Sequence, residues 1–323
     1  MRLSTAAAVA ILAATSHLAA QQGKPVPPDR PIRTTSTRAP LQQVAFASDN
    51  TTLMGWDAYG FARWDPETNK TLDRQPVIAK ACEKHRGPVL PRSEDGRTIA
   101  ANCAGKLVFF DMATGAARGE FTYDPKQIPT IYTQSPNGAL MAGVGAGNTT
   151  AIQIVDTKSG QRGVLIQNEQ EVQQMSFSSS GDLLVTGAVD GVRIWRLPEG
   201  ELVRKIPGGT FHAMSADART LAMERGRDVA IIDMASGTAK QTLPGAATQL
   251  RFSQDGSVLA GWTNQQLTVW DVASGKPRLT LKASQLVTVA LSNDAKLLAA
   301  VGMEFGGGGA QTSVGVWRIP PPQ

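Results

Sequence analysis

The chain has 323 residues, of which 41% are hydrophobic and 18% are charged, so it has enough apolar material for a large core and is not intrinsically disordered. Its 32 glycines and 19 prolines indicate many turns and argue against long helices. The net charge of +5 is small for this length, and the densest basic stretch, residues 24–38, is Pro-rich, which is typical of a tether. We therefore expect no nucleic-acid partner.

The first twenty residues have the pattern of a secretory signal peptide. Arg2 gives a positive start, an apolar run follows at 6–14, and Ala19-Ala20 provide a small-residue exit. The run is shorter than the roughly 20 residues that cross a bilayer, and no later stretch reaches that length, so we expect no membrane span. The sequence thus predicts a signal peptide over 1–20, a Pro-rich linker over 21–30 and a periplasmic or secreted mature protein.

Two cysteines, Cys82 and Cys103, are present. In an oxidising compartment this pair could form a disulfide, and the alternative is two small buried thiols on neighbouring strands. Neither His85 nor His212 stands at metal-ligand spacing from the cysteines, so we expect no zinc site and no cofactor.

From residue 41 onwards the chain repeats two short anchors. One is an apolar strand that leads into a Ser/Asp-Gly-like turn, at 46–50, 93–96, 135–138, 177–181, 215–218, 252–256 and 291–295. The other is an apolar residue followed by Asp or Arg, at 64–65, 110–111, 155–156, 195–196, 232–233, 270–271 and 317–318. Seven units over 41–323 give a mean length of about 40 residues, which is that of a four-stranded propeller blade.

These units resemble those of the WD-repeat family of seven-bladed propellers, and the resemblance covers essentially the whole mature chain. In the fourth unit, Thr186, Asp190 and Trp195 stand where the family has three members of a hydrogen-bonded His, Ser/Thr, Asp and Trp tetrad, and Asn168 stands at the His position. His85 matches the family His in the second unit, which lacks the Asp. The resemblance implies an all-β, seven-bladed propeller of four-stranded antiparallel blades, with these residues as structural remnants of the tetrad. Because no unit keeps all four, six or eight blades remain open.

The end of the chain predicts how the ring closes. The seventh unit ends at 314–319 and is followed by three prolines, which cannot continue a paired strand. The last blade therefore lacks an outer strand, and 31–38 is the spare β-prone segment. We expect 31–38 to supply that strand, so that the propeller spans 31–323 and leaves no open edge.

The sequence contains no Gly-x-Ser-x-Gly elbow and no phosphate-binding loop, and its carboxylates lie mostly at turn positions. The first hypothesis is therefore a monomeric, non-catalytic platform or scaffold that binds an unknown protein partner. The alternative is a propeller enzyme, a metal-dependent hydrolase or lactonase, with its site at the central channel. A third hypothesis is the extracytoplasmic sensor of a signalling or transport assembly.

A candidate partner-binding patch consists of Trp56, Tyr59, Trp262, Met303 and Phe305. The two tryptophans stand at the same offset in units one and six, each just after a glycine, and the other three are expected in neighbouring loops. Units six, seven and one are adjacent in a closed ring, and aromatic side chains and Met are enriched in interface cores. The alternative is that both tryptophans pack between blades.

Overall fold

The computed structural model describes residues 33–37 and most of the chain from residue 41 onwards. It does not describe 1–32, 38–40, 48, 58–59, 66–67, 69, 83–97, 104, 112–114, 123–128, 146, 210–211, 284, 307–308 and 323. The described residues form 27 strands and one short helix, α2 (Val77–Ala81). Within them, no helix has the length and apolar character needed to cross a bilayer.

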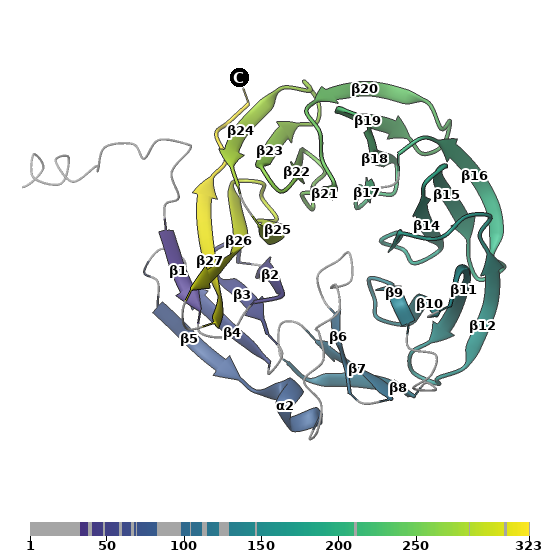
Figure 1. Ribbon diagram of the computed structural model, residues 1–323, viewed down its shortest axis with the longest axis horizontal. Coiled ribbons are helices and arrows are strands. Elements are labelled where there is room, and N and C mark those ends of the chain that lie inside the picture. The colour runs from purple at the N-terminus through teal and green to yellow at the C-terminus, as the bar shows by residue number, and fades with distance from the viewer. Residues whose placement is uncertain are drawn as a thin grey trace, which may run out of the picture.

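The strands form seven antiparallel sheets around a central axis, as Figure 1 shows, and the predicted fold class is confirmed. Blade 1 consists of β2 (Gln43–Phe46), β3 (Leu53–Trp56), β4 (Phe61–Asp65) and β5 (Lys70–Gln75). Blade 2 contains β6 (Thr98–Asn102), β7 (Lys106–Asp111) and β8 (Ala117–Thr122). The segment before β6, where a further strand of this blade is expected, lies outside the described residues.

Blades 3 to 6 each have four strands, which follow one another in the sheet in chain order. Blade 3 consists of β9 (Pro129–Gln134), β10 (Leu140–Gly145), β11 (Asn148–Asp156) and β12 (Arg162–Gln167). Blade 4 consists of β13 (Gln174–Phe177), β14 (Leu183–Ala188), β15 (Gly191–Arg196) and β16 (Glu201–Pro207). Blade 5 consists of β17 (His212–Met214), β18 (Thr220–Arg225), β19 (Asp228–Asp233) and β20 (Ala239–Pro244). Blade 6 consists of β21 (Gln249–Phe252), β22 (Val258–Trp262), β23 (Gln266–Asp271) and β24 (Pro277–Lys282).

Blade 7 is completed by a strand from the other end of the chain. Its own strands are β25 (Leu286–Leu291), β26 (Leu297–Gly306) and β27 (Gly309–Arg318), and β1 (Arg33–Thr37) pairs antiparallel with β27. The expected closing strand over 31–38 is thus seen as β1, and the ring is closed by an N-terminal strand.

The repeated anchors form turns that are held by a serine and a carboxylate. In blade 5 the Ser215 hydroxyl donates to Asp217 at 2.6 Å and accepts from the Thr220 amide at 3.0 Å. The second anchor uses an Asp that accepts from the backbone N–H and hydroxyl of the serine three residues on; Asp156, Asp233 and Asp271 do so. Each of the three Asp turns ends on a glycine with φ near +70°, a conformation that favours glycine. Local turn chemistry therefore accounts for the repeat.

The core lies between the blades. The described residues form seven apolar clusters, and each cluster joins two neighbouring blades around the ring. Both faces of each blade are covered in this way, which explains the runs of consecutive buried residues in the middle strands, such as β22 and β14. The result is a rigid frame whose seven interfaces are equivalent in kind.

Candidate functional site

The structure buries both tryptophans of the predicted patch. Trp56 is 0% exposed and Trp262 is 6% exposed. The Trp56 ring lies 6.2 Å from that of Phe110 in blade 2, and Trp262 packs in the cluster that contains Leu298 and Ile319 of blade 7. The prediction that these tryptophans form an exposed docking patch is wrong, and the alternative, packing between blades, is what the structure contains.

The preceding glycines explain this arrangement. Successive residues of a strand point to opposite faces of the sheet. A Cβ on Gly55 would lie 2.5 Å from the Trp64 ring of the same blade, and one on Gly261 would lie 2.6 Å from the Trp270 ring. The glycine therefore makes room for a tryptophan on one face, and the residue that follows it points into the neighbouring blade.

The other three patch residues lie either in a strand or outside the described residues. Met303 and Phe305 lie in β26, where their backbones pair with Thr312 and Ala310, although a loop was predicted. Tyr59 lies outside the described residues.

Three residues of the fourth unit form a buried hydrogen-bonded chain. Trp195 Nε1 donates to Thr186 Oγ1 at 3.0 Å, and the Thr186 hydroxyl donates to Asn168 Oδ1 at 3.4 Å. Asn168 Nδ2 in turn donates to the carbonyl of Gln170 at 2.6 Å, so the asparagine occupies the place that the family gives to histidine. His85, the remnant expected in the second unit, lies outside the described residues.

Asp190 does not join that chain, and the expected partners are wrong. Its two carboxylate oxygens accept from Arg193 Nη1 at 2.9 Å and Nη2 at 2.7 Å, and Lys205 lies 3.0 Å away. The Arg193 side chain is fully buried and also donates to Glu169 at 2.7 Å. The hydrogen bond from Arg193 holds the pKa of Asp190 well below its usual range. Asp190 is thus part of an ion network at the turn between β14 and β15.

The cysteines lie beside each other in the interface between blades 1 and 2. Cys82 follows α2 and Cys103 follows β6, their Cα atoms are 5.1 Å apart, and they are bonded as a disulfide. That Cα separation is ordinary for a disulfide.

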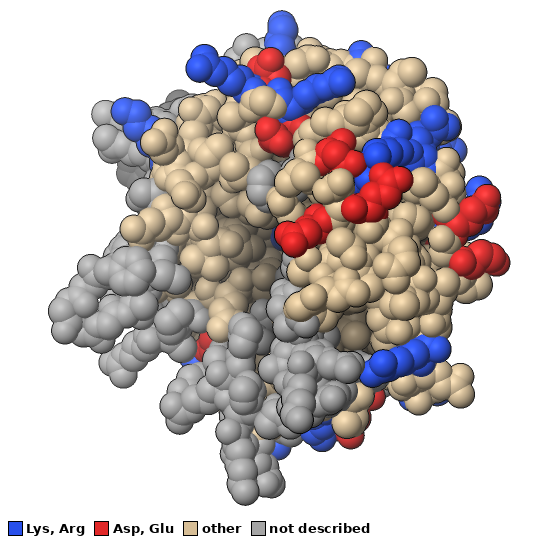
Figure 2. Space-filling model, turned by 45° about the vertical axis from the view of Figure 1, so that its right-hand side comes forward, with Lys and Arg blue, Asp and Glu red and all other residues tan. Residues whose placement is uncertain are grey.

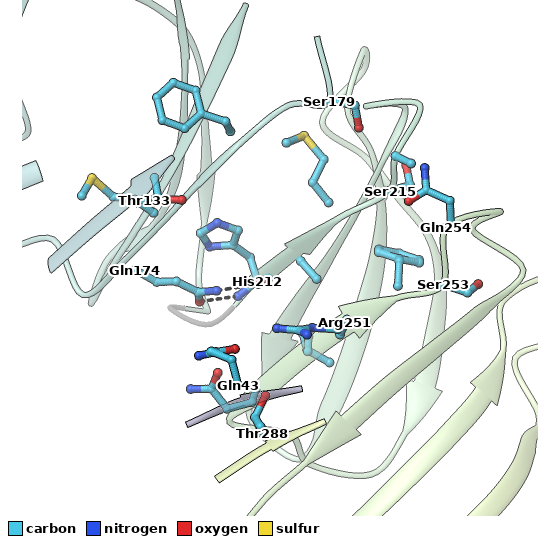
Figure 3. A pocket seen from close by; sticks show the side chains of 18 of the residues that line it. Gln43, Thr133, Gln174, Ser179, His212, Ser215, Arg251, Ser253, Gln254 and Thr288 are labelled. Atoms are coloured by element: carbon cyan, nitrogen blue, oxygen red, sulfur yellow. Dashed lines mark hydrogen bonds between the residues drawn. The ribbon is translucent and has the colours of Figure 1, made fainter. Parts of the chain in front are cut away.

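The hollow of the ring is a cavity of about 300 Å³. It is lined by the innermost strands of blades 1 and 3 to 7, and Figure 3 shows polar side chains from several of them around one space. Three of these strands begin with a glutamine, namely Gln43, Gln174 and Gln249. The recurrence of glutamine at this position of the unit is visible in the sequence and could have indicated a polar lining, but we did not predict it.

Polar side chains connect one inner strand to the next across the cavity wall. Gln174 Nε2 donates to the His212 carbonyl at 2.8 Å, and the His212 N–H donates to Gln174 Oε1 at 3.0 Å (Figure 3). His212 Nε2 lies 2.9 Å from the Ser176 hydroxyl. Arg251 Nη1 donates to the Val289 carbonyl at 2.9 Å, from blade 6 to blade 7. These contacts hold neighbouring blades together at the axis.

The described residues place no group of three or more His, Cys, Asp or Glu side chains where they could hold a metal ion. The Ser176 and His212 pair has the residue types of a nucleophile and a base, but both side chains are buried. This pair therefore reads as an inter-blade contact.

Large exposed apolar side chains gather on two neighbouring blades. Of the five among the described residues, Leu165 lies on β12 of blade 3, and Val189, Leu202 and Val203 lie in blade 4; Leu72 stands apart in blade 1. Figure 2 brings this side of the ring forward and shows acidic and basic side chains side by side. We call Leu165, Val189, Leu202 and Val203 the apolar rim of blades 3 and 4; charged side chains of both signs lie on the same side of the ring.

The fold defines the class of the chain as a seven-bladed β-propeller. No family model matches the chain. The chain is similar to Pre-mRNA-processing factor 19 homolog 2 of Arabidopsis thaliana, with 28% identity over 181 residues, which cover 50% of this chain and 33% of that protein. The chain thus spans about a third of the length of this relative.

Proposed function

We propose that this protein is a non-catalytic protein-binding scaffold that acts outside the cytoplasm. The observation that carries the proposal is the use of its carboxylates: Asp156, Asp217, Asp233 and Asp271 are engaged in the turns that build the frame. A rigid ring whose chemically active side chains serve its own turns is suited to presenting surface.

A metal-dependent hydrolase at the central channel has no specific observation in its favour. The described residues that line the cavity include no Asp or Glu, which are the ligands that such a site uses to hold its metal.

The binding surface is the apolar rim of blades 3 and 4. Leu165 is 53% exposed and Leu202 is 43% exposed on the outer strands of these blades. The two strands meet where a Cβ on Gly200, in the turn before β16, would lie 2.9 Å from Val164 of β12. Together with Val203, which is 40% exposed, these side chains offer apolar area on two neighbouring outer strands that a partner can cover.

A cross-linking capture experiment tests the scaffold. The mature protein is immobilised, exposed to an extracytoplasmic extract and cross-linked, and the captured proteins are identified. We expect a discrete partner that the double variant Leu165→Lys/Leu202→Lys captures at least about tenfold less. Leu72→Lys is the matched control, because Leu72 is 51% exposed on the outer strand of blade 1. If Leu72→Lys reduces capture as much as the double variant does, the apolar rim is not the binding surface. If the unchanged protein captures no partner, the scaffold function is refuted.

The location rests on the residue pattern of 1–20 and on the Cys82–Cys103 disulfide. Expression of the full chain in a bacterium, followed by fractionation and N-terminal sequencing, tests it. We expect an exported protein that begins at Gln21, whereas uncleaved protein in the cytoplasm would contradict the proposal.

A further inference from the structure

A second cavity lies between blades 6 and 7, on the side where β24 packs against β26 and β27 (Figure 1). Its volume is about 220 Å³. Blade 6 contributes Leu267 and Leu281 to the wall, and blade 7 contributes Ala300 and Trp317. The described part of the lining contains one charged residue, Lys282, whose side chain is exposed. The interior of this space therefore favours an apolar molecule.

The cavity is there because blade 7 has small side chains where blade 5 has a large one. In β26 and β27, Ala300 pairs with Gly315, two residues before the Trp317 of the repeat. At the equivalent place in blade 5, Met223 pairs with Ala230, and Met223 is fully buried. Protein interiors are close-packed, so side-chain volume that is missing from one blade leaves a space against its neighbour.

One polar group in the wall points to the chemistry of a ligand. Trp317 Nε1 is buried and has no hydrogen-bond partner among the described residues. In blade 6 the same tryptophan of the repeat, Trp270, donates to the carbonyl of Pro244, the last residue of β20. The corresponding strand here is β24, and its last residue, Lys282, lines the cavity. The cavity thus lies between Trp317 and the strand end that supplies the acceptor in blade 6.

A buried N–H without an acceptor destabilises the protein, so a ligand oxygen that reaches this N–H gains a hydrogen bond at no cost to an existing one. We propose that the cavity between blades 6 and 7 binds a small, neutral, largely apolar molecule whose oxygen accepts a hydrogen bond from Trp317 Nε1. Small ketones, aldehydes and esters with a ring or a short chain have this chemistry. Apolar cavities of roughly 150 Å³ bind benzene, so this larger one holds a ring with a short substituent. The proposal is independent of the scaffold function, whose surface is the apolar rim of blades 3 and 4.

Calorimetric titration of the mature protein tests the site with three probes. Acetophenone has a ring and a carbonyl acceptor, ethylbenzene has a similar shape without the acceptor, and benzoate carries a charge. We expect saturable binding of acetophenone and of ethylbenzene. Benzoate should bind at least about tenfold more weakly than acetophenone, because its carboxylate loses water in an apolar space.

The hydrogen bond is measured by Trp317→Phe, which keeps a ring in the wall and removes the N–H. We expect this variant to weaken acetophenone about tenfold and to change ethylbenzene much less, since only acetophenone accepts the bond. Trp270→Phe is the matched control. Trp270 stands at the same position of blade 6, but its N–H already donates to Pro244, so both affinities should stay unchanged.

A second variant fills the cavity and keeps the test decisive if Trp317→Phe does not fold. Ser313 lines the cavity and is partly exposed, so Ser313→Leu should fold and should weaken both acetophenone and ethylbenzene at least about tenfold. Its matched control is Thr280→Leu. Thr280 is exposed on β24 beside the buried Leu279 and Leu281, and it is not part of the lining, so binding should be unchanged.

Two measurements distinguish a small molecule from other occupants. A mature chain that begins at residue 31 should bind acetophenone with unchanged affinity; tighter binding would mean that the segment before β1, which pairs with β27, fills the cavity. Ser313→Leu should leave the cross-linking capture of a protein partner unchanged; a loss would mean that the cavity takes a partner side chain. Either result overturns the proposal. So do benzoate binding as tight as that of acetophenone, an equal effect of Trp317→Phe on both neutral probes, full affinity in Ser313→Leu, and no saturable binding at millimolar concentration.

Discussion

Blades 4 and 6 hold the same tryptophan of the repeat in two different ways. In blade 4, Trp195 Nε1 donates to Thr186 Oγ1 at 3.0 Å, and both residues belong to the same blade. In blade 6 the equivalent of the threonine is Gly261, over which the Trp270 ring lies, and Trp270 Nε1 donates to the carbonyl of Pro244 at 3.0 Å. Pro244 is the last residue of β20, the outer strand of blade 5.

The difference shows that the polar tetrad is one of two solutions to the same packing problem. Blade 4 fixes its tryptophan inside the sheet, whereas blade 6 fixes it against the preceding blade. Blade 1 has the same arrangement as blade 6 in this respect, because Gly55 lies under the Trp64 ring. A unit that keeps the tryptophan but lacks the threonine can therefore still form a blade with a glycine in place of the threonine.

The largest effect is expected for Trp56, which follows Gly55 in β3 and packs against the neighbouring blade. Trp56→Ala removes a fully buried ring from the interface of blades 1 and 2, so the free energy of unfolding should fall by about 3–5 kcal/mol. Urea denaturation measures this loss. The matched control Leu72→Ala, on an exposed side chain, should change stability by no more than about 0.5 kcal/mol. A small loss of stability for Trp56→Ala would mean that the packing of this tryptophan does not hold blades 1 and 2 together.

Asp190→Ala tests whether blade 4 depends on more than its tryptophan. The change leaves the buried Arg193 with one of its two acidic partners, so we expect a loss of about 3 kcal/mol by urea denaturation. The capture of a partner should be unchanged below the melting temperature. Loss of capture without loss of stability would mean that Asp190 belongs to a binding surface.

The same residue makes the stability of blade 4 depend on pH through its ion network. Arg193 lowers the pKa of Asp190 in the folded protein, so the contribution of the ionised carboxylate to stability is complete above the unfolded pKa and is lost as the pH falls through the folded one. The stability difference between the unchanged protein and Asp190→Asn should therefore be largest near neutral pH and shrink below about pH 4. Glu171→Gln, at an exposed position, is the control. A constant difference down to acidic pH would refute the role of this ion network.

Gly261→Ala tests the glycine solution directly. Its Cβ would lie 2.6 Å from the Trp270 ring and 2.9 Å from Ala247, and we expect overpacking to cost about 2 kcal/mol. Gly163→Ala is the matched control, because Gly163 is in a strand and its Cβ would meet nothing closer than 3.6 Å. Thermal denaturation of both variants gives the comparison, and equal melting temperatures would contradict the need for glycine.

The smallest effect is expected for the hydrogen bond of blade 4. Thr186→Val keeps the shape of the side chain and leaves the Trp195 N–H without its acceptor, with a loss of about 1 kcal/mol. Thr186→Ser retains the hydroxyl and should recover part of that loss. If the valine variant is as stable as the original, this hydrogen bond does not stabilise blade 4.

Local chemistry explains why the architecture was predictable. The turns that define each unit are made by residues two to five positions apart, such as Ser215 and Asp217. The repeat can therefore be recognised from the sequence alone. The closing strand was predictable for a related reason, since prolines end the last unit and one β-prone segment was spare. These features depend on neighbours along the chain.

The sites were less predictable because they depend on neighbours across the ring. The direction of Trp56 follows from the contact between Gly55 and Trp64, which the spacing of aromatic residues does not reveal. The resemblance to WD repeats could not predict the partners of Asp190, because Arg193 has no counterpart in the tetrad. The central cavity brings together short stretches from six blades, such as 212–216 and 249–254, that lie far apart in the sequence.

The pairing of β1 with β27 determines the order in which the ring can be assembled. Blades 3 to 6 consist of consecutive hairpins and can form as each stretch of chain is synthesised. Blade 7 must wait for both ends, and the bond from the Leu41 amide to Thr312 Oγ1 joins positions 271 residues apart. Because folding slows as the sequence separation of contacts rises, we expect this closure to be the slowest step of assembly. Until it occurs, β27 is an open edge on which the β1 of a second molecule can pair, so two chains produced at high concentration can exchange this strand.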